Sequence, residues 1–133
     1  MSMWEKKVLV VDDDPDMVGV ITMILESQGY QVVVANDGIE CLERLSAERP
    51  DLMILDLLMP KMDGFAVYKE LMSPAWSEYR DMPVVILSSV REEASRRRYE
   101  LETGQELSTD NYLEKPISPN VLLDCVEKLL KQR

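Results

Sequence analysis

A small set of polar side chains follows short apolar runs of this chain, at the points where strands would end. The set consists of Asp12, Asp13, Asp56, Ser88 and Lys115. Three neighbouring carboxylates would repel one another, and a divalent cation would relieve that repulsion. Carboxylate oxygens with room for several waters suit Mg²⁺, with Mn²⁺ as the alternative. A metal, an ammonium and a hydroxyl around one carboxylate form a site at which that carboxylate could attack a phosphoryl group in line.

The composition excludes several other kinds of site. The chain contains no histidine, which excludes Ser-His-Asp catalysis, Cys-His catalysis and every zinc site that uses histidine. Cys41 and Cys125 are too few for a disulfide scaffold or a Cys-only zinc site, and their places on helical apolar stripes predict buried thiols. With a formal net charge of −10, the chain is not expected to bind nucleic acid or an anionic membrane directly.

The length of 133 residues fits a single domain, with a core from residue 6 to residue 131. No apolar run approaches the roughly 20 residues of a membrane span. Residues 1–7 lack the apolar stretch of a signal peptide. We therefore expect one cytoplasmic domain, without an output domain in these residues.

Five short apolar runs alternate with longer segments of helical spacing. The expected strands are residues 7–11, 31–35, 52–55, 84–87 and 111–113. Strands that alternate with helices form a parallel sheet with helices on both faces, so the pattern predicts an α/β fold. Ligands of such open sheets bind outside the carboxyl ends of the strands, and the polar set named above should share that edge.

Capping residues and prolines predict where the helices begin. Asp14-Pro15 and Ser118-Pro119 each place a capping side chain before a proline suited to the first helical turn. Gly29 stands where the first helix should stop. Residues 92–102 have a helical pattern that loosens toward residue 110.

Four motifs, in order along the chain, resemble the receiver domain of two-component response regulators, the CheY-like family. They are VLVVDDDP (8–15), DLLMPKMDG (56–64), PVVILSS (83–89) and YLEKP (112–116). The resemblance covers essentially the whole chain. It implies a flavodoxin-like, doubly wound sheet of five parallel strands in the order 2-1-3-4-5, with five helices.

The resemblance also implies roles for individual residues. Asp56 would be the phosphoacceptor. Asp13 and Asp56 would ligate Mg²⁺ through their carboxylates, with the backbone carbonyl of Leu58 as a third ligand. Asp12 would act mainly through a metal-bound water. Lys115 would form a salt bridge with the phosphoryl group.

Two further roles leave alternatives open. Ser88 matches the family's hydroxyl residue, which hydrogen-bonds a phosphoryl oxygen, although chemistry alone does not separate it from Ser89. Tyr112 matches the aromatic residue whose ring moves inward when that hydroxyl is drawn to the phosphate; simple strand packing is the other interpretation. The Lys115-Pro116 peptide bond is expected to be cis.

The function implied by the resemblance is signalling, not enzymatic turnover. A sensor histidine kinase or phosphotransfer protein would phosphorylate Asp56. The surface of the fourth helix, fifth strand and fifth helix would then bind an effector or a second copy. A Mg²⁺-dependent phosphatase of the haloacid dehalogenase type, with Asp12 as nucleophile, is the alternative, because Asp12-x-Asp14 follows an apolar strand. A receiver-like module that is never phosphorylated is a third hypothesis.

Two departures from the family pattern affect these expectations. Leu58 and Val90 are apolar and lie two residues beyond Asp56 and Ser88, at positions that affect water access in the family. Because neither can orient an attacking water, we expect slow loss of the phosphoryl group. Residues 105–111 make a longer connection than usual, and the sequence leaves open whether the chain acts alone or within a longer regulator.

Overall fold

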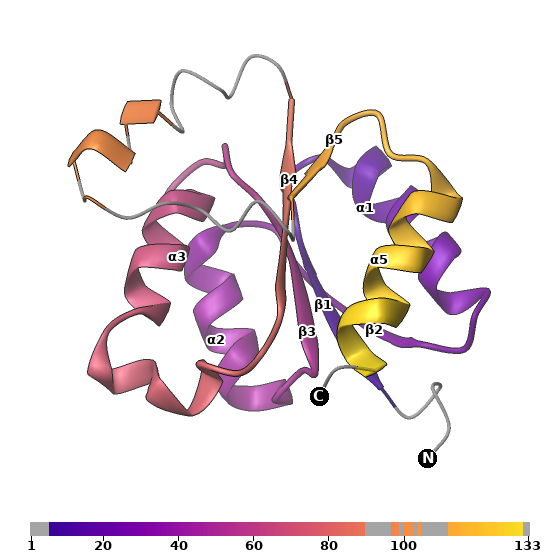
Figure 1. The fold of residues 1–133 in the computed structure, drawn as a ribbon, viewed down its shortest axis with the longest axis horizontal. Coiled ribbons are helices and arrows are strands. Elements are labelled where there is room, and N and C mark those ends of the chain that lie inside the picture. Colours follow the sequence, from indigo (N-terminus) through magenta and orange to yellow (C-terminus); the bar gives the residue numbers. More distant parts are fainter. Residues whose placement is uncertain (1–5, 90–96, 99, 103, 105–111, 132–133) are drawn as a thin grey trace.

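The computed structural model describes residues 6–89, 97–98, 100–102, 104 and 112–131. Its centre is a parallel sheet of five strands in the order β2-β1-β3-β4-β5 (Figure 1). The strands are β1 (Lys7–Val11), β2 (Gln31–Ala35), β3 (Leu52–Asp56), β4 (Val84–Ser88) and β5 (Tyr112–Glu114). The helices are α1 (Pro15–Glu26), α2 (Gly38–Glu48), α3 (Gly64–Leu71), the 3₁₀ helix η2 (Pro74–Tyr79) and α5 (Pro119–Lys131). The expected fold class and strand order are confirmed.

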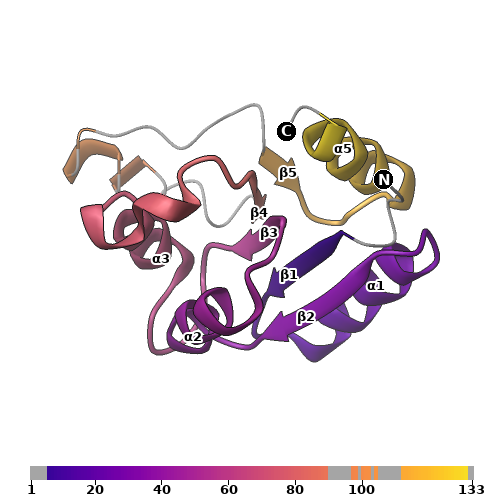
Figure 2. The same ribbon diagram turned by 90° about the horizontal axis from the view of Figure 1, so that it is seen from below.

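Both faces of the sheet are covered, and the strands are accordingly apolar on both sides. Helices α2 and α3 cover one face, and α1 and α5 cover the other (Figures 1 and 2). In β1, Leu9 and Val11 pack toward α2 and α3, whereas Val8 and Val10 pack toward α1 and α5. This alternation follows from the two-residue period of a strand. It produces two cores, one on each side of a shared sheet.

Three helices begin at an aspartate that caps the first turn. Asp14 accepts a hydrogen bond from the Asp16 amide at 3.0 Å, in agreement with the capping role predicted for it. Asp37 and Asp63 do the same for α2 and α3, at 2.8 and 2.9 Å. These side chains satisfy amides that have no partner inside the helix. Each cap lies beyond the carboxyl end of the preceding strand.

The strands differ from their predicted bounds mainly at the ends. β3 and β4 each run one residue further than expected, so Asp56 and Ser88 belong to the sheet itself. Their backbones are paired there, with Asp56 opposite Leu87 and Ser88 opposite Glu114. β5 ends at Glu114 where residue 113 was expected, and residue 111 lies outside the described part.

Other differences lie in the connections. The helix η2 was not predicted, although Ser73-Pro74 is the same kind of start signal as Ser118-Pro119. Of the helix expected at 92–102, residues 97–98 and 100–102 are helical, and the others lie outside the described residues. The longer 105–111 connection and Val90 lie outside them too. Within the described residues, no helix combines the length and the hydropathy that crossing a bilayer requires.

Candidate functional site

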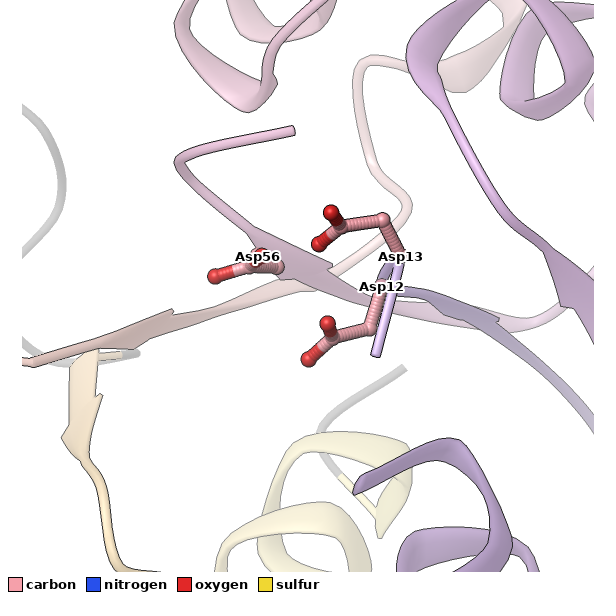
Figure 3. A group of neighbouring side chains, drawn as sticks. All are labelled: Asp12, Asp13 and Asp56. Atoms are coloured by element: carbon pink, nitrogen blue, oxygen red, sulfur yellow. The ribbon is translucent and has the colours of Figure 1, made fainter. Parts of the chain in front are cut away.

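Three carboxylates meet at the carboxyl edge of the sheet. Asp12 and Asp13 follow β1, and Asp56 ends the adjacent β3, which pairs with β1 in parallel. Carboxylate oxygens of the three residues lie within 4.8 Å of one another, and their side chains point toward the same space (Figure 3). Asp12 is 0% exposed and Asp56 is 2% exposed, whereas Asp13 is open to solvent. The convergence expected from the sequence is therefore present.

One cation faces two of these carboxylates. Lys115 Nζ lies 3.1 Å from Asp56 Oδ1 and 3.4 Å from Asp12 Oδ2. The Lys115 amide donates a hydrogen bond to the Ser88 carbonyl at 2.7 Å, which positions this lysine beside the end of β4. The Lys115-Pro116 peptide bond is cis, as predicted. A single ammonium does not neutralise three carboxylates, so the cluster keeps a net negative charge.

The two oxygens of Asp12 have different surroundings. Oδ1 accepts a hydrogen bond from the Asp14 amide at 3.0 Å. Oδ2 is buried and accepts no hydrogen bond within the described part of the chain; the Lys115 ammonium is near enough for charge attraction only. A buried carboxylate oxygen without a donor is costly. The donor set, three hard carboxylates with one such orphaned oxygen, fits a Mg²⁺ ion that keeps several waters.

The carboxylates line an open pocket of about 380 Å³. Its lining residues are Asp12, Asp13, Asp14, Asp56, Leu58, Ser89 and Lys115. Leu58, the expected carbonyl ligand, is therefore at the pocket, and the residue is 41% exposed. Ser89 also lines it, whereas Ser88, the hydroxyl favoured by the motif, is 2% exposed and donates to the Ser89 carbonyl at 3.1 Å. The structure thus brings the expected set together except for the Ser88 hydroxyl.

Tyr112 lies on β5, opposite Ile86 of β4. Its ring is half-buried and packs against the core on the α2 and α3 side of the sheet. This placement fits the packing interpretation, and the switch role stays a prediction. Cys41 is fully buried, as predicted, while Cys125 is only partly buried.

Two parts of the site's surroundings were not found from the sequence. Ser89 follows β4 directly and lines the pocket, whereas the motif favours Ser88 and leaves Ser89 only as the alternative. The ion pair between Lys61 and Asp37, with 3.5 Å between Nζ and Oδ2, was missed altogether. Its two members are far apart in the sequence, and no local pattern connects them.

Comparison with known proteins identifies the family. The family model "Response regulator receiver domain" matches residues 8–127. This chain belongs to the receiver domain family. Receiver domains are the phosphoacceptor signalling domains of two-component systems, as the sequence motifs indicated. The phosphatase alternative based on Asp12 gains no support from these matches.

Relatives and solved structures agree with this assignment. A probable transcriptional regulator, ycf27 of Cyanophora paradoxa, is 37% identical over 99% of this chain and 51% of its own length. The alkaline phosphatase synthesis transcriptional regulatory protein PhoP of Bacillus subtilis is 36% identical over 96% of this chain and 49% of its own length. The receiver chain therefore spans about half the length of these curated relatives.

Among solved structures, the signal receiver domain of a Syntrophus aciditrophicus histidine kinase has a TM-score of 0.79 at 34% identity. The alignment covers 96% of this receiver and 91% of that chain. Chemotaxis protein CheY4 of Vibrio cholerae has a TM-score of 0.76 at 29% identity, over 93% and 98% of the two chains.

Proposed function

We propose that Asp56 of this receiver accepts a phosphoryl group from a phosphohistidine on a sensor histidine kinase or phosphotransfer protein. These 133 residues contain no histidine, so the donor imidazole lies outside this receiver domain. Small acyl phosphates are expected to serve as donors as well. The main support is that Asp56, at the end of β3, is close to two other carboxylates and is held by the Lys115 ammonium.

The chemistry proposed for the site is an in-line displacement. A carboxylate oxygen of Asp56 forms a bond to phosphorus while the P–N bond of the donor breaks. The bonding pair returns to the imidazole nitrogen, which takes a proton from solvent. The Lys115 ammonium, already beside Asp56, is placed to pair with a phosphoryl oxygen. Bound Mg²⁺, held by Asp13, Asp56 and the Leu58 carbonyl with Asp12 acting through water, would neutralise charge on the phosphoryl oxygens.

The proposed output is a population shift between two surface states of the receiver. The Ser88 hydroxyl would move to a phosphoryl oxygen, and Tyr112 on the neighbouring β5 would respond. The face formed by β5, α5 and the fourth helix, expected at residues 92–102, would then bind an effector protein or a second copy. We place this reaction in the cytoplasm, which is supported by relatives named as transcriptional regulators.

The test is to find which residue becomes phosphorylated. The receiver is incubated with Mg²⁺ and acetyl phosphate, and intact mass followed by peptide mapping locates the added group. Wild type should gain one phosphoryl group, Asp56→Asn should gain none, and Asp12→Asn should need more Mg²⁺ to gain it. Asp63→Asn, which can keep the α3 cap, is the matched control and should behave as wild type.

Two results would overturn the proposal. Loss of modification in Asp12→Asn at every Mg²⁺ concentration, with modification retained in Asp56→Asn, would assign the nucleophile to Asp12. Absence of modification in wild type, together with no response to beryllofluoride, would identify a receiver-like module that is never phosphorylated.

A further inference from the structure

The loop between β3 and α3, residues 57–63, is held at both ends by glycines. The Gly64 amide donates to the Leu57 carbonyl at 2.9 Å, and the Gly38 amide donates to the Met62 carbonyl at 2.8 Å. Gly64 belongs to α3, but Gly38 is the first residue of α2. The loop that carries Leu58 to the metal pocket is therefore attached to a helix that contributes no residue to that pocket.

The contact at Gly38 leaves no room for a side chain. A Cβ atom there would lie 2.8 Å from both Cβ and Cγ of Met62 and would collide with the Met62 carbonyl oxygen. The backbone of Gly38 is helical and has no positive φ, so α2 itself does not require a glycine. Alanine is the better helix former. What requires glycine at this position is thus the close approach of the loop.

A second contact joins the same two elements. Asp37 caps α2 with Oδ1, and its Oδ2 lies 3.5 Å from Lys61 Nζ in the loop. The Glu40 amide, followed by the Lys61 ammonium, lowers the pKa of Asp37, so the carboxylate stays charged at neutral pH. The backbone of Lys61 is left-handed, with φ of 65°, a conformation that is uncommon for residues other than glycine. The side chain of Lys61 is 68% exposed, so this ion pair is the weaker of the two contacts.

We propose that the first turn of α2 positions the metal-binding loop, with Gly38 as the principal positioning residue and the Asp37–Lys61 pair as a secondary one. This inference rests on the proposed Mg²⁺-dependent function, in which the Leu58 carbonyl is a metal ligand. Neither Gly38 nor Lys61 lines the pocket, so their effect on the metal passes through the loop backbone. Outer residues that orient metal ligands commonly change metal affinity by about 10- to 100-fold when substituted.

The main experiment compares two glycine-to-alanine variants by Mg²⁺ titration calorimetry. Gly38→Ala should weaken Mg²⁺ affinity by about tenfold because the loop must move away from the new methyl group. Gly19→Ala is the matched control, because a Cβ atom on Gly19 of α1 meets nothing within 4 Å. It should raise the unfolding midpoint in EDTA and leave Mg²⁺ affinity unchanged. A folded Gly38→Ala variant with wild-type Mg²⁺ affinity would overturn the proposal.

A second variant separates positioning from simple electrostatics and does not depend on whether Gly38→Ala folds. Removing the Lys61 charge should tighten Mg²⁺ binding if the lysine acts only by repelling the ion. If the lysine positions the loop, Lys61→Met should instead bind Mg²⁺ about twofold to fivefold more weakly, while Lys69→Met on α3 should not. Tighter binding by Lys61→Met would contradict its positioning role. Failure of wild type to bind Mg²⁺ would instead overturn the proposed function, and so the two failures are distinguishable.

Discussion

The ammonium of Lys115 lies 3.1 Å from Oδ1 of Asp56, so the pocket places a cation beside the carboxylate that the metal and the phosphoryl group would also contact. The same ammonium is 3.4 Å from Asp12 Oδ2, and both carboxylates are buried. Lys115 therefore offsets part of the repulsion that Mg²⁺ would otherwise relieve. Because Lys115 and Mg²⁺ are both cations, they should compete for electrostatic interaction with these carboxylates.

This competition gives a first prediction. Lys115→Met should bind Mg²⁺ about tenfold more tightly than wild type, because a nearby positive charge is removed. Without metal, the variant should lose about 3 kcal/mol of stability, the low end for a broken buried ion pair because the Lys115 side chain is 20% exposed. Calorimetry and urea unfolding in EDTA and in Mg²⁺ measure both effects. Unchanged or weaker Mg²⁺ binding would show that the lysine does not compete.

A second prediction concerns Leu58, a residue that lines the pocket and is 41% exposed. An apolar side chain cannot orient a water for attack on the aspartyl phosphate. Leu58→Asn should therefore speed loss of the phosphoryl group by about tenfold. The rate is followed by intact mass after removal of acetyl phosphate. Leu101→Asn changes an exposed leucine outside the pocket and should keep the wild-type rate; equal rates in all three proteins would contradict the prediction.

A third prediction concerns the thiols. Burial raises the pKa of Cys41 to about 12 from the ordinary 9.0, with a smaller contribution from the Asp37 charge. Burial also raises the pKa of Cys125, which is only partly covered. At pH 8, a disulfide reagent should modify Cys125 slowly and Cys41 only after unfolding. Rapid modification of both thiols in the folded receiver would contradict the burial of Cys41.

The raised pKa of Cys41 also sets the sign of a pH effect. Above about pH 9 the unfolded chain releases the thiol proton, whereas the folded chain keeps it until its higher pKa is reached. The unfolded state then binds fewer protons, so the contribution of Cys41 to stability decreases as pH rises from 9 toward 12. Cys41→Ala should remove that part of the pH dependence in urea unfolding experiments.

Much of the fold could be predicted from the sequence because its signals are local. Apolar runs such as residues 7–11 and 52–55 predict strands, and Asp14-Pro15 predicts the start of a helix. The two-sided burial of β1 follows directly from its unbroken apolar sequence. The helix η2 was not predicted even though Ser73-Pro74 resembles the other start signals, because the six residues of η2 lack an apolar stripe long enough to identify a helix.

The residues that form the site could be predicted, but the orientation of each side chain and its contacts with distant elements could not. Asp12, Asp13 and Asp56 were expected to converge because strand ends share one edge of the sheet, and their oxygens do lie within 4.8 Å of one another. The contact between Gly38 and Met62 could not be predicted, since it depends on how a loop packs against a distant helix. Which of the two serines faces the pocket could not be predicted either, because it depends on the backbone conformation at the end of β4.

The two serines at the end of β4 give the last prediction. Ser88 is buried and its hydroxyl donates to the Ser89 carbonyl at 3.1 Å, while Ser89 lines the pocket. If Ser88 is the switch hydroxyl, it must leave this bond to reach a phosphoryl oxygen. Ser88→Ala should then be phosphorylated at a rate within about threefold of wild type, because Mg²⁺ and Lys115 stabilise most of the transition-state charge.

The switch should fail in that variant even though phosphorylation proceeds. Beryllofluoride should shift the amide resonances of Tyr112 and Leu113 in wild type and in Ser89→Ala, since β5 pairs directly with β4. In Ser88→Ala these shifts should be absent, because the Ser88 hydroxyl is no longer present to connect the acceptor site to the end of β4. The opposite pattern, with the response lost only in Ser89→Ala, would assign the switch to the serine that already faces the pocket. The motif would then have selected the wrong hydroxyl, and the hydrogen bond of Ser88 would serve only to satisfy a buried polar group.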